Sequence, residues 1–131
     1  MKTVNILVPF DRHSSNFKSL YHAFALAERI RAKVIVYFFK DKFWGENSTI
    51  SLEKACLEMT RSACEEGISV SFHTTHEAPG EELTNIIKKE NINLIVIDGT
   101  DTDMESVIKG IKPGASIQII KVKGKKIIHS I

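Results

Sequence analysis

Cysteine, proline, tryptophan and long apolar stretches are all scarce in this chain of 131 residues, which has 2 Cys, 3 Pro and 1 Trp. The longest apolar run, Val34 to Phe39, is far too short to cross a bilayer, and no charged-then-apolar leader opens the chain. We therefore expect a cytoplasmic protein, with no membrane insertion of this chain.

The two cysteines, Cys56 and Cys64, fall within one expected helix. That spacing separates them by roughly 12 Å along the helix axis, which is too far for a disulfide. We interpret both as small core residues of a reduced compartment. No pair of cysteines or histidines has the spacing of a zinc site, so no metal site is predicted.

Charge is nearly balanced overall, at +2, but it is unevenly distributed. The chain from Val107 onward has no acidic residue and six lysines, at positions 109, 112, 121, 123, 125 and 126. No aromatic residue interleaves with these lysines, so a stacking surface for single-stranded nucleic acid is not supported. We interpret the lysines as a solvated end and expect no nucleic-acid partner.

Apolar patterns with strand and helix periods alternate along the chain. The expected strands cover residues 4–9, 33–39, 68–74, 94–97 and 116–122. The expected helices cover residues 15–31, 51–66, from 79 onward, and 103–111, with Ser14 or Ser15 as the cap of the first and Gly67 ending the second. Residues 41–50 form the longest irregular stretch. Its Trp44 is either a lid over the cleft or an anchor for a partner, or it packs back onto the helices of the domain itself.

Strands joined by helices of this length imply a parallel sheet with right-handed crossovers and helices on both faces. The expected fold is thus a three-layer αβα domain over residues 1–124, followed by a tail, 125–131, of uncertain state. In residues 68–74 apolar and polar side chains alternate, which is typical of a sheet edge with one wetter face.

Four segments resemble the universal stress protein family in order and spacing. The run from Asn5 to Asp11 resembles that family's opening strand, which ends Val-Pro-x-Asp. Residues 32–39 resemble its second strand, residues 77–83 the start of its third helix, and residues 93–99 its fourth strand with the first glycine of a nucleotide loop. The similarity covers nearly the whole chain.

This resemblance implies the strand order 3-2-1-4-5 and a site for AMP or ATP in the members that bind nucleotide. Asp11 matches the aspartate that touches adenine, and Phe39 replaces a residue that is usually a smaller valine. Gly99 matches the first glycine of the loop. The adenosine-side candidates are therefore Pro9, Asp11, Phe39, Gly99 and Thr100.

Beyond Gly99 the nucleotide-binding pattern breaks. The family's loop reads Gly-x-x-Gly, nine residues, then Gly-Ser or Gly-Thr, whereas here Thr102 stands at the second glycine and Lys112 at the third. Cradling phosphates needs consecutive backbone N–H groups in conformations that glycine permits. Four carboxylates crowd the same segment and would repel a polyphosphate; they belong to Asp98, Asp101, Asp103 and Glu105. We therefore predict that ATP is not bound tightly.

Three other readings of the polar clusters are weaker. Residues 98–103 lack the glycine and the final bidentate acid of a calcium loop. A phospho-accepting receiver domain needs an acidic pair after the first strand, where only Asp11 stands. The His13–Ser14 pair has no strained nucleophile turn, and the His73–His76 pair lies at a strand end where hydrogen bonding is the commoner role. No catalytic residue is predicted.

The sequence therefore favours a non-enzymatic regulatory or stress-response module that needs no cofactor and acts through a protein partner that the sequence does not identify. Two alternatives stay open: an AMP- or ATP-binding member of the same family, and a cytosolic regulatory domain of a membrane transporter. Family members commonly pair through the fifth strand, so residues 116–122 are expected to form a homodimer contact, although Lys121 and Lys123 could instead protect that edge.

Overall fold

The computed structural model describes residues 3–11, 17–40, 46–77, 79–99, 102–111, 117–123 and 126–130. Its strands are β1 (Asn5–Phe10), β2 (Lys33–Phe39), β3 (Ser69–Thr75), β4 (Leu94–Asp98), β5 (Gln118–Lys123) and β6 (Lys126–Ser130). Its helices are α1 (Lys18–Ile30), α2 (Glu46–Glu65), α3 (Pro79–Lys89) and α4 (Thr102–Gly110).

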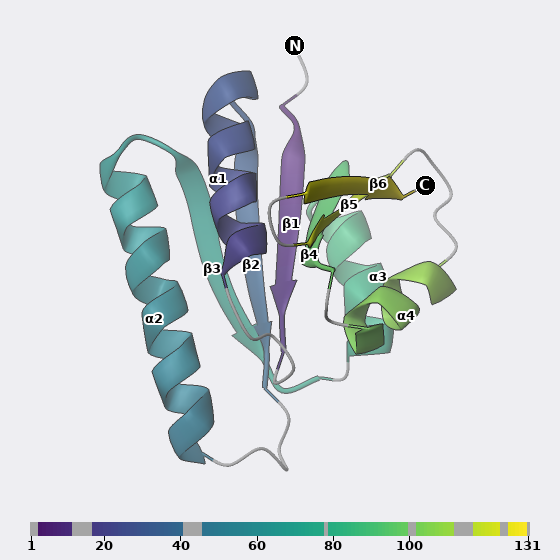
Figure 1. Cartoon of the computed structure of the whole chain (residues 1–131). Helices are drawn as coiled ribbons and strands as arrows, with labels where there is room; N and C mark the ends of the chain where they lie inside the picture. Colours follow the sequence, from purple (N-terminus) through teal and green to yellow (C-terminus); the bar gives the residue numbers. More distant parts are fainter. Residues whose placement is uncertain are drawn as a thin grey trace.

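The strands form one sheet in the order β3-β2-β1-β4-β5-β6 (Figure 1). The first five are parallel, as the sequence predicts, and their order 3-2-1-4-5 is confirmed. Continuous apolar runs in β1, β2 and β4 explain why these strands lie in the middle, since a strand covered on both faces buries every side chain.

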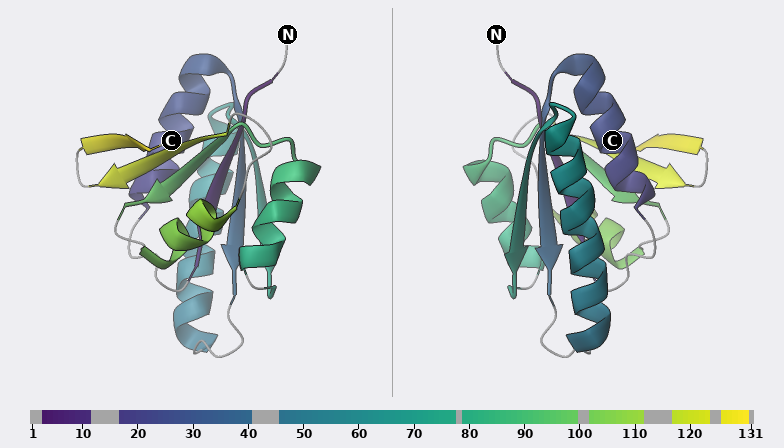
Figure 2. Two further views of the ribbon diagram at one scale, coloured as in Figure 1. Left: turned by 90° about the vertical axis from the view of Figure 1, so that its right-hand side faces the viewer. Right: turned by 90° about the vertical axis from the view of Figure 1, so that its left-hand side faces the viewer.

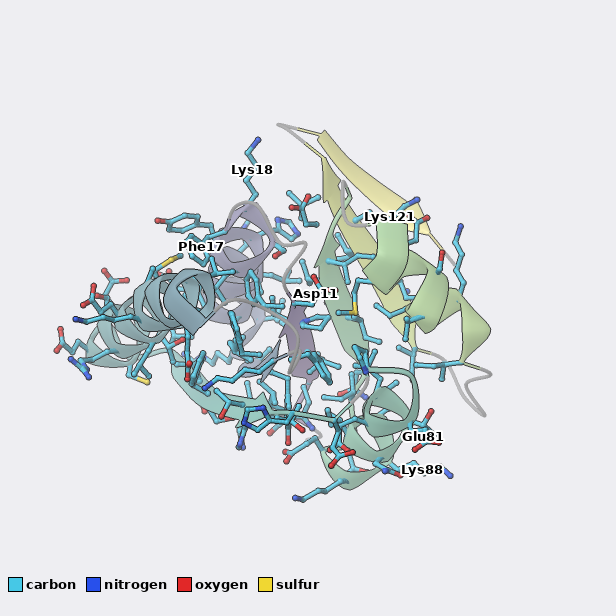
Figure 3. The ribbon with its side chains drawn as sticks, turned by 90° about the horizontal axis from the view of Figure 1, so that it is seen from below. Asp11, Phe17, Lys18, Glu81, Lys88 and Lys121 are labelled. Atoms are coloured by element: carbon cyan, nitrogen blue, oxygen red, sulfur yellow. The ribbon has the colours of Figure 1, made fainter. Side chains whose placement is uncertain are left out.

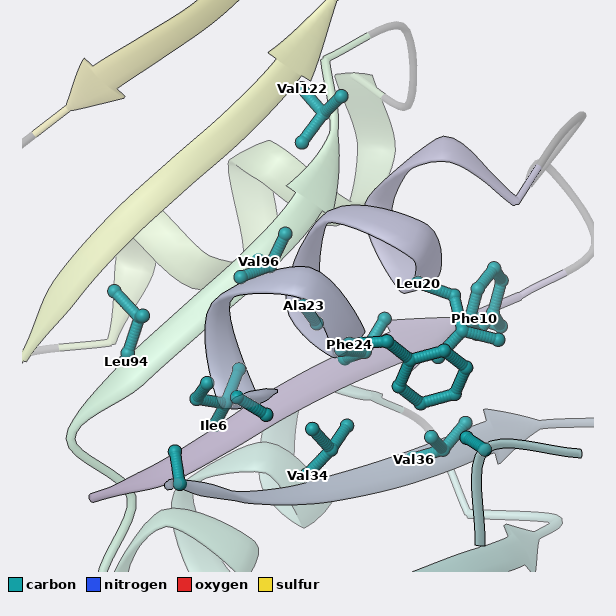
Figure 4. Close-up of a cluster of buried hydrophobic side chains, with 14 of the residues drawn as sticks. Ile6, Phe10, Leu20, Ala23, Phe24, Val34, Val36, Leu94, Val96 and Val122 are labelled. Atoms are coloured by element: carbon teal, nitrogen blue, oxygen red, sulfur yellow. The ribbon is translucent and has the colours of Figure 1, made fainter. Parts of the chain in front are cut away.

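Helices cover both faces of the sheet (Figure 2). An apolar cluster fills the space between helices and sheet on each face. The first cluster packs α1 and α2 against one face, around residues such as Phe10, Leu20 and Val36 (Figure 4). The second packs α3 and α4 against the other, around Leu83, Ile97 and others. Because side chains alternate along each strand, neighbouring residues of one strand belong to opposite clusters.

Several local expectations are corrected by the structure. Helix α2 begins at Glu46, so residues 46–50 are helical and not irregular. Helix α1 begins at Lys18 with Phe17 as its N-cap and no side-chain cap bond, so the predicted serine cap is wrong. Cys64 is exposed, although Cys56 is buried as predicted. Gly67 ends α2 with a φ of 94°, a conformation that glycine adopts without strain.

The predicted tail, residues 125–131, contains a sixth strand, β6, that no sequence pattern indicates. Strand β6 pairs antiparallel with β5, from Lys123 opposite Lys126 to Ile119 opposite Ser130. Strand β5 therefore has a neighbour from its own chain on each side, β4 and β6. Association of two copies through β5 stays a prediction, and it would require β6 to leave that edge first.

The amino end of β1 is fastened to the turn before β4 by two asparagines. The backbone N–H of Asn5 donates to Oδ1 of Asn93 at 2.8 Å, and the N–H of Asn93 donates to the carbonyl of Asn5 at 3.0 Å. The Nδ2 group of Asn5 also donates to the carbonyl of Glu90 at 3.0 Å. These bonds fix β4 beside β1 at the end of the sheet opposite to the carboxyl ends of the strands.

Candidate functional site

Strands β1 and β4 pair only over a short distance. Their register contains two positions, Ile6 opposite Leu94 and Leu7 opposite Ile95. By contrast, β1 pairs with β2 along its whole length, up to Phe10 opposite Phe38. The carboxyl halves of β1 and β4 therefore run on without a ladder between them, at the point where the strand order reverses. Open α/β sheets bind ligands at this point.

Pro9 explains why the ladder stops. The N–H of Lys33 donates to the carbonyl of Val4 at 2.9 Å, so the even-numbered residues of β1 turn their backbone groups toward β2. Pro9 therefore faces β4, where the next ladder bond would run from residue 9 to the carbonyl of Val96. Proline has no N–H to donate, so that bond cannot form.

Some of the predicted adenosine-side residues lie at this end of the sheet. Figure 3 looks onto the carboxyl ends of the strands and shows Asp11 near the centre. Asp11 is buried to 9% exposure directly after β1, and Phe39 is buried in the second cluster at the end of β2. The ring of Phe39 lies 6.3 Å from that of Tyr37. Thr100 lies outside the described residues.

Gly99 extends the sheet instead of opening a loop. Its backbone N–H donates to the carbonyl of Val122 at 2.8 Å, which continues the ladder between β4 and β5. The first expected donor of the loop is thus already engaged within the chain.

The charge around α4 differs from the sequence-based estimate. The carboxylate of Glu105 accepts hydrogen bonds from Nζ of Lys121 at 2.8 Å and is paired with Nζ of Lys109 at 3.0 Å. The bond from Lys121, and then that from Lys109, lowers the pKa of Glu105. One of the four carboxylates expected to repel phosphate is therefore matched by two lysines. The electrostatic objection to a polyphosphate is therefore weaker than the sequence alone predicts.

Asp98, another of those carboxylates, ends β4. Leu94 and Val96 of the same strand belong to the cluster under α1, and alternation carries Asp98 to the same face. It is buried to 6% exposure. The side chains of Asp101 and Asp103 lie outside the described part of the chain.

One member of the two histidine pairs, His73, has contacts in the described part of the chain. His73 stacks on Tyr37 with 4.7 Å between ring centroids, and its Nε2 shares a hydrogen bond of 3.1 Å with Oγ of Ser71. Burial, and then the charges of Glu90 and Glu82, raise the pKa of Tyr37. His13, Ser14 and Trp44 lie outside the described residues. Within the described ranges, no three potential metal ligands come together.

Sequence reasoning missed two features of this end of the sheet. The pairing of Lys121 with Glu105 joins β5 to α4 across the fold, and no local pattern signals it. The interruption of the ladder by Pro9 could have been predicted from the sequence, because a proline inside a central strand must face a side where no ladder bond is needed.

A groove of about 500 Å³ lies between α3 and α4, lined by Gly80, Thr84, Ser106 and neighbouring residues.

Comparison with known proteins places these observations in a family. The model of the Universal stress protein family matches residues 3–110. No curated protein is similar enough in sequence to match the chain. Among the described residues, no helix combines the length and the apolar character needed to cross a bilayer.

Solved structures of this family share the fold at low identity. The universal stress protein UspA from Lactobacillus plantarum is 16% identical with a TM-score of 0.72, over 93% of this chain and 99% of that one. The Archaeoglobus fulgidus protein in complex with dAMP is 16% identical with a TM-score of 0.68, over 94% and 100%. The Arabidopsis thaliana family protein with AMP bound is 12% identical with a TM-score of 0.59, over 92% and 91%.

Proposed function

This chain belongs to the universal stress protein family, and on that premise we propose that it is a non-enzymatic regulatory module of a stress response that does not hold a triphosphate. The observation that carries the proposal is the hydrogen bond from the N–H of Gly99 to the carbonyl of Val122. A phosphate cradle needs that N–H to point toward the ligand.

The local structure after Gly99 supports the same conclusion. Helix α4 begins at Thr102, so only two residues separate its first turn from Gly99. A loop this short offers few backbone donors beyond those of the helix terminus itself. The partial positive charge of one helix terminus is about half an elementary charge, which is small against the charge of a triphosphate.

A second candidate function is recognition of the adenosine half of a nucleotide. Two observations favour it: the β1–β4 ladder ends at Leu7 and Ile95, and a buried carboxylate, that of Asp11, follows β1 at this point. Two proteins of the same fold were solved with dAMP and with AMP, which both carry a single phosphate. We propose that Asp11 and the end of β2 at Phe39 would contact the adenosine half, with Pro9 keeping the strands apart.

Calorimetry with ATP, AMP and adenosine, each with and without Mg²⁺, tests both candidates. For the adenosine-binding function we expect the three affinities to agree within about threefold, because the added phosphates find no donors. An ATP affinity at least about a hundredfold above that of AMP would contradict the proposal. If none of the three ligands binds, the regulatory role would have to depend on contact with a protein partner.

The non-enzymatic part of the proposal is tested in the same samples, in which we expect no release of phosphate from ATP.

A further inference from the structure

Strand β3 forms one edge of the sheet, beside α2 (Figure 2, right). Its inner side pairs with β2 from Ser69 to Thr75, and no described strand pairs with its outer side. The sequence of β3, SVSFHTT, contains no lysine, no acid and no proline. Sheet edges are ordinarily protected by such residues, because a bare edge invites another strand.

The direction of the backbone groups on β3 can be deduced from one bond. The N–H of Lys40 donates to the carbonyl of Thr75 at 2.8 Å, so the odd-numbered residues of β3 face β2. The backbone groups of Val70, Phe72 and Thr74 therefore point outward. The thiol of Cys64 agrees with this deduction, since it donates a hydrogen bond to the outward carbonyl of Val70, with 3.6 Å between Sγ and the oxygen. The carbonyl oxygen has a second lone pair, which can accept from a donor on another strand.

We propose that a second copy of this chain binds to the β3 edge and forms a two-fold dimer with an antiparallel β3–β3 contact. With Phe72 on the two-fold axis, Phe72 lies opposite Phe72 of the second copy, and Val70 lies opposite its Thr74. All three outward-facing residues then meet outward-facing residues, which is the condition for hydrogen-bonded pairs in an antiparallel ladder.

Side chains in this register are compatible as well. Val70 and Phe72 are half-buried against the cluster under α2, and each meets an apolar or hydroxyl-bearing side chain. On the opposite face Ser71 lies against His73 of the second copy, and these residue types already share a hydrogen bond within the chain. No like charges oppose each other, because β3 carries none of the charged residues that would repel a copy.

Helix α2 adds an apolar contact beside the edge. Leu57 is 39% exposed and stands two turns before Cys64, on the same face of the helix. Because Cys64 reaches the outward carbonyl of Val70, Leu57 lies over the edge nearer the carboxyl end of β3. A second copy docked on β3 would cover it.

The mass in solution tests the proposal directly. Light scattering after size-exclusion chromatography should give twice the 14.7 kDa of the chain, with the dimer growing as the protomer concentration rises from about 5 to about 500 µM. Thr74→Pro removes one outward N–H and leaves the ladder to β2 intact, so it should weaken self-association at least about tenfold. Thr74→Ala, the matched control, keeps that N–H and should associate like the parent.

A second pair of variants leaves β3 unchanged. Leu57→Lys should weaken the dimer, whereas Tyr21→Lys changes a more exposed apolar residue, 63% exposed on α1, and should not. Circular dichroism and thermal melting establish that each variant is folded. A monomeric mass at every concentration, or a dimer that Thr74→Pro and Leu57→Lys leave intact, overturns the proposal.

Disulfide trapping tests the register. In a Cys64→Ser background, Ser71→Cys and His73→Cys would lie opposite each other in the dimer, with Cα atoms about 4.5 Å apart, within the range of a disulfide. A mixture of the two variants should cross-link under mild oxidation, whereas each variant alone places its cysteines about 7 Å or more apart and should cross-link much more slowly. Equal rates in the mixture and in the separate samples would overturn the proposed register.

Discussion

The backbone N–H of Gly99 donates a hydrogen bond to the carbonyl oxygen of Val122, with 2.8 Å between the two atoms. This bond makes Gly99 the last residue of a ladder between β4 and β5, where a phosphate loop would need it as the first donor of a cradle. An N–H that is engaged within the sheet is not free to donate to a phosphate.

Gly99→Ala tests whether Gly99 contributes to binding. Since the N–H of Gly99 stays engaged with the carbonyl of Val122, we expect alanine to be accepted and the affinity for AMP to change by less than about twofold. In a phosphate loop the same change would remove a required conformation. A large loss of AMP affinity in the folded variant, measured by calorimetry, would contradict this use of Gly99.

Asp11→Asn removes the charge expected on the adenosine side. Because hydrogen bonds to charged groups contribute about 1.5–3 kcal/mol, we expect the affinity for AMP or adenosine to fall about tenfold or more. Asp98→Asn is the matched control, because Asp98 is similarly buried but lies on the face of β4 covered by α1. Equal losses in the two variants would argue against a specific role for Asp11.

Pro9→Ala restores an N–H that faces the carbonyl of Val96. We expect the β1–β4 ladder to extend by one bond, so the new amide should exchange with solvent at least about tenfold more slowly than an exposed amide. The affinity for AMP should fall as the strands draw together. Pro79→Ala, at the first residue of α3, adds an N–H that faces no ladder and serves as the control. An unprotected amide at residue 9 with unchanged affinity would show that Pro9 does not hold the strands apart.

Lys121→Met should reveal the pH dependence of the contact between β5 and α4. The partners lower the pKa of Glu105 below its ordinary value of 4.5, so the stabilisation is fully present above pH 4.5 and is lost as the pH falls through the folded-state pKa. We expect the variant to lose at most about 1 kcal/mol of unfolding free energy near neutral pH, and the difference from the parent to shrink toward about pH 3. Urea unfolding at both pH values measures it.

The matched control is Lys109→Met. Lys109 is paired with the same carboxylate but is 60% exposed at its side chain, against 21% for Lys121. Solvent screens the more exposed pair, so its removal should cost less. A larger effect from Lys109 would reverse the ranking of the two contacts.

The two cysteines should differ sharply in reactivity. Burial, and then the charge of Glu53, raise the pKa of the Cys56 thiol to about 12, so this thiol stays protonated below pH 9. Cys64 is exposed. Alkylation of the native protein at about pH 8 should label Cys64 and leave Cys56 unlabelled until denaturant is added, as mass spectrometry of the peptides will show. Equal labelling of both in the native state would contradict the burial of Cys56.

The sequence by itself determined the alternation of strands and helices, the parallel direction of the strands and the edge position of β3. The order 3-2-1-4-5 came from the resemblance to the universal stress protein family, and the structure confirms it. Apolar period, strand length and the handedness of crossovers are local or near-local properties, so they can be read along the chain. The extent of β2, Lys33–Phe39, was predicted correctly because its residues from Val34 to Phe39 are all buried and form one continuous apolar run. The position of Asp11 after β1 followed from the same pattern.

Only the tertiary structure decided which segment covers the β5 edge of the sheet and which groups accept hydrogen bonds from its donors. The pairing of β6 with β5, the hydrogen bond between Gly99 and Val122 and the contact of Lys121 with Glu105 all join segments that lie far apart or carry no distinctive pattern. Hydrogen-bond partners depend on which backbone groups face each other after folding, and that direction changes with every residue along a strand. Apart from a proline inside a strand, such as Pro9, the sequence pattern does not indicate which backbone groups face each other.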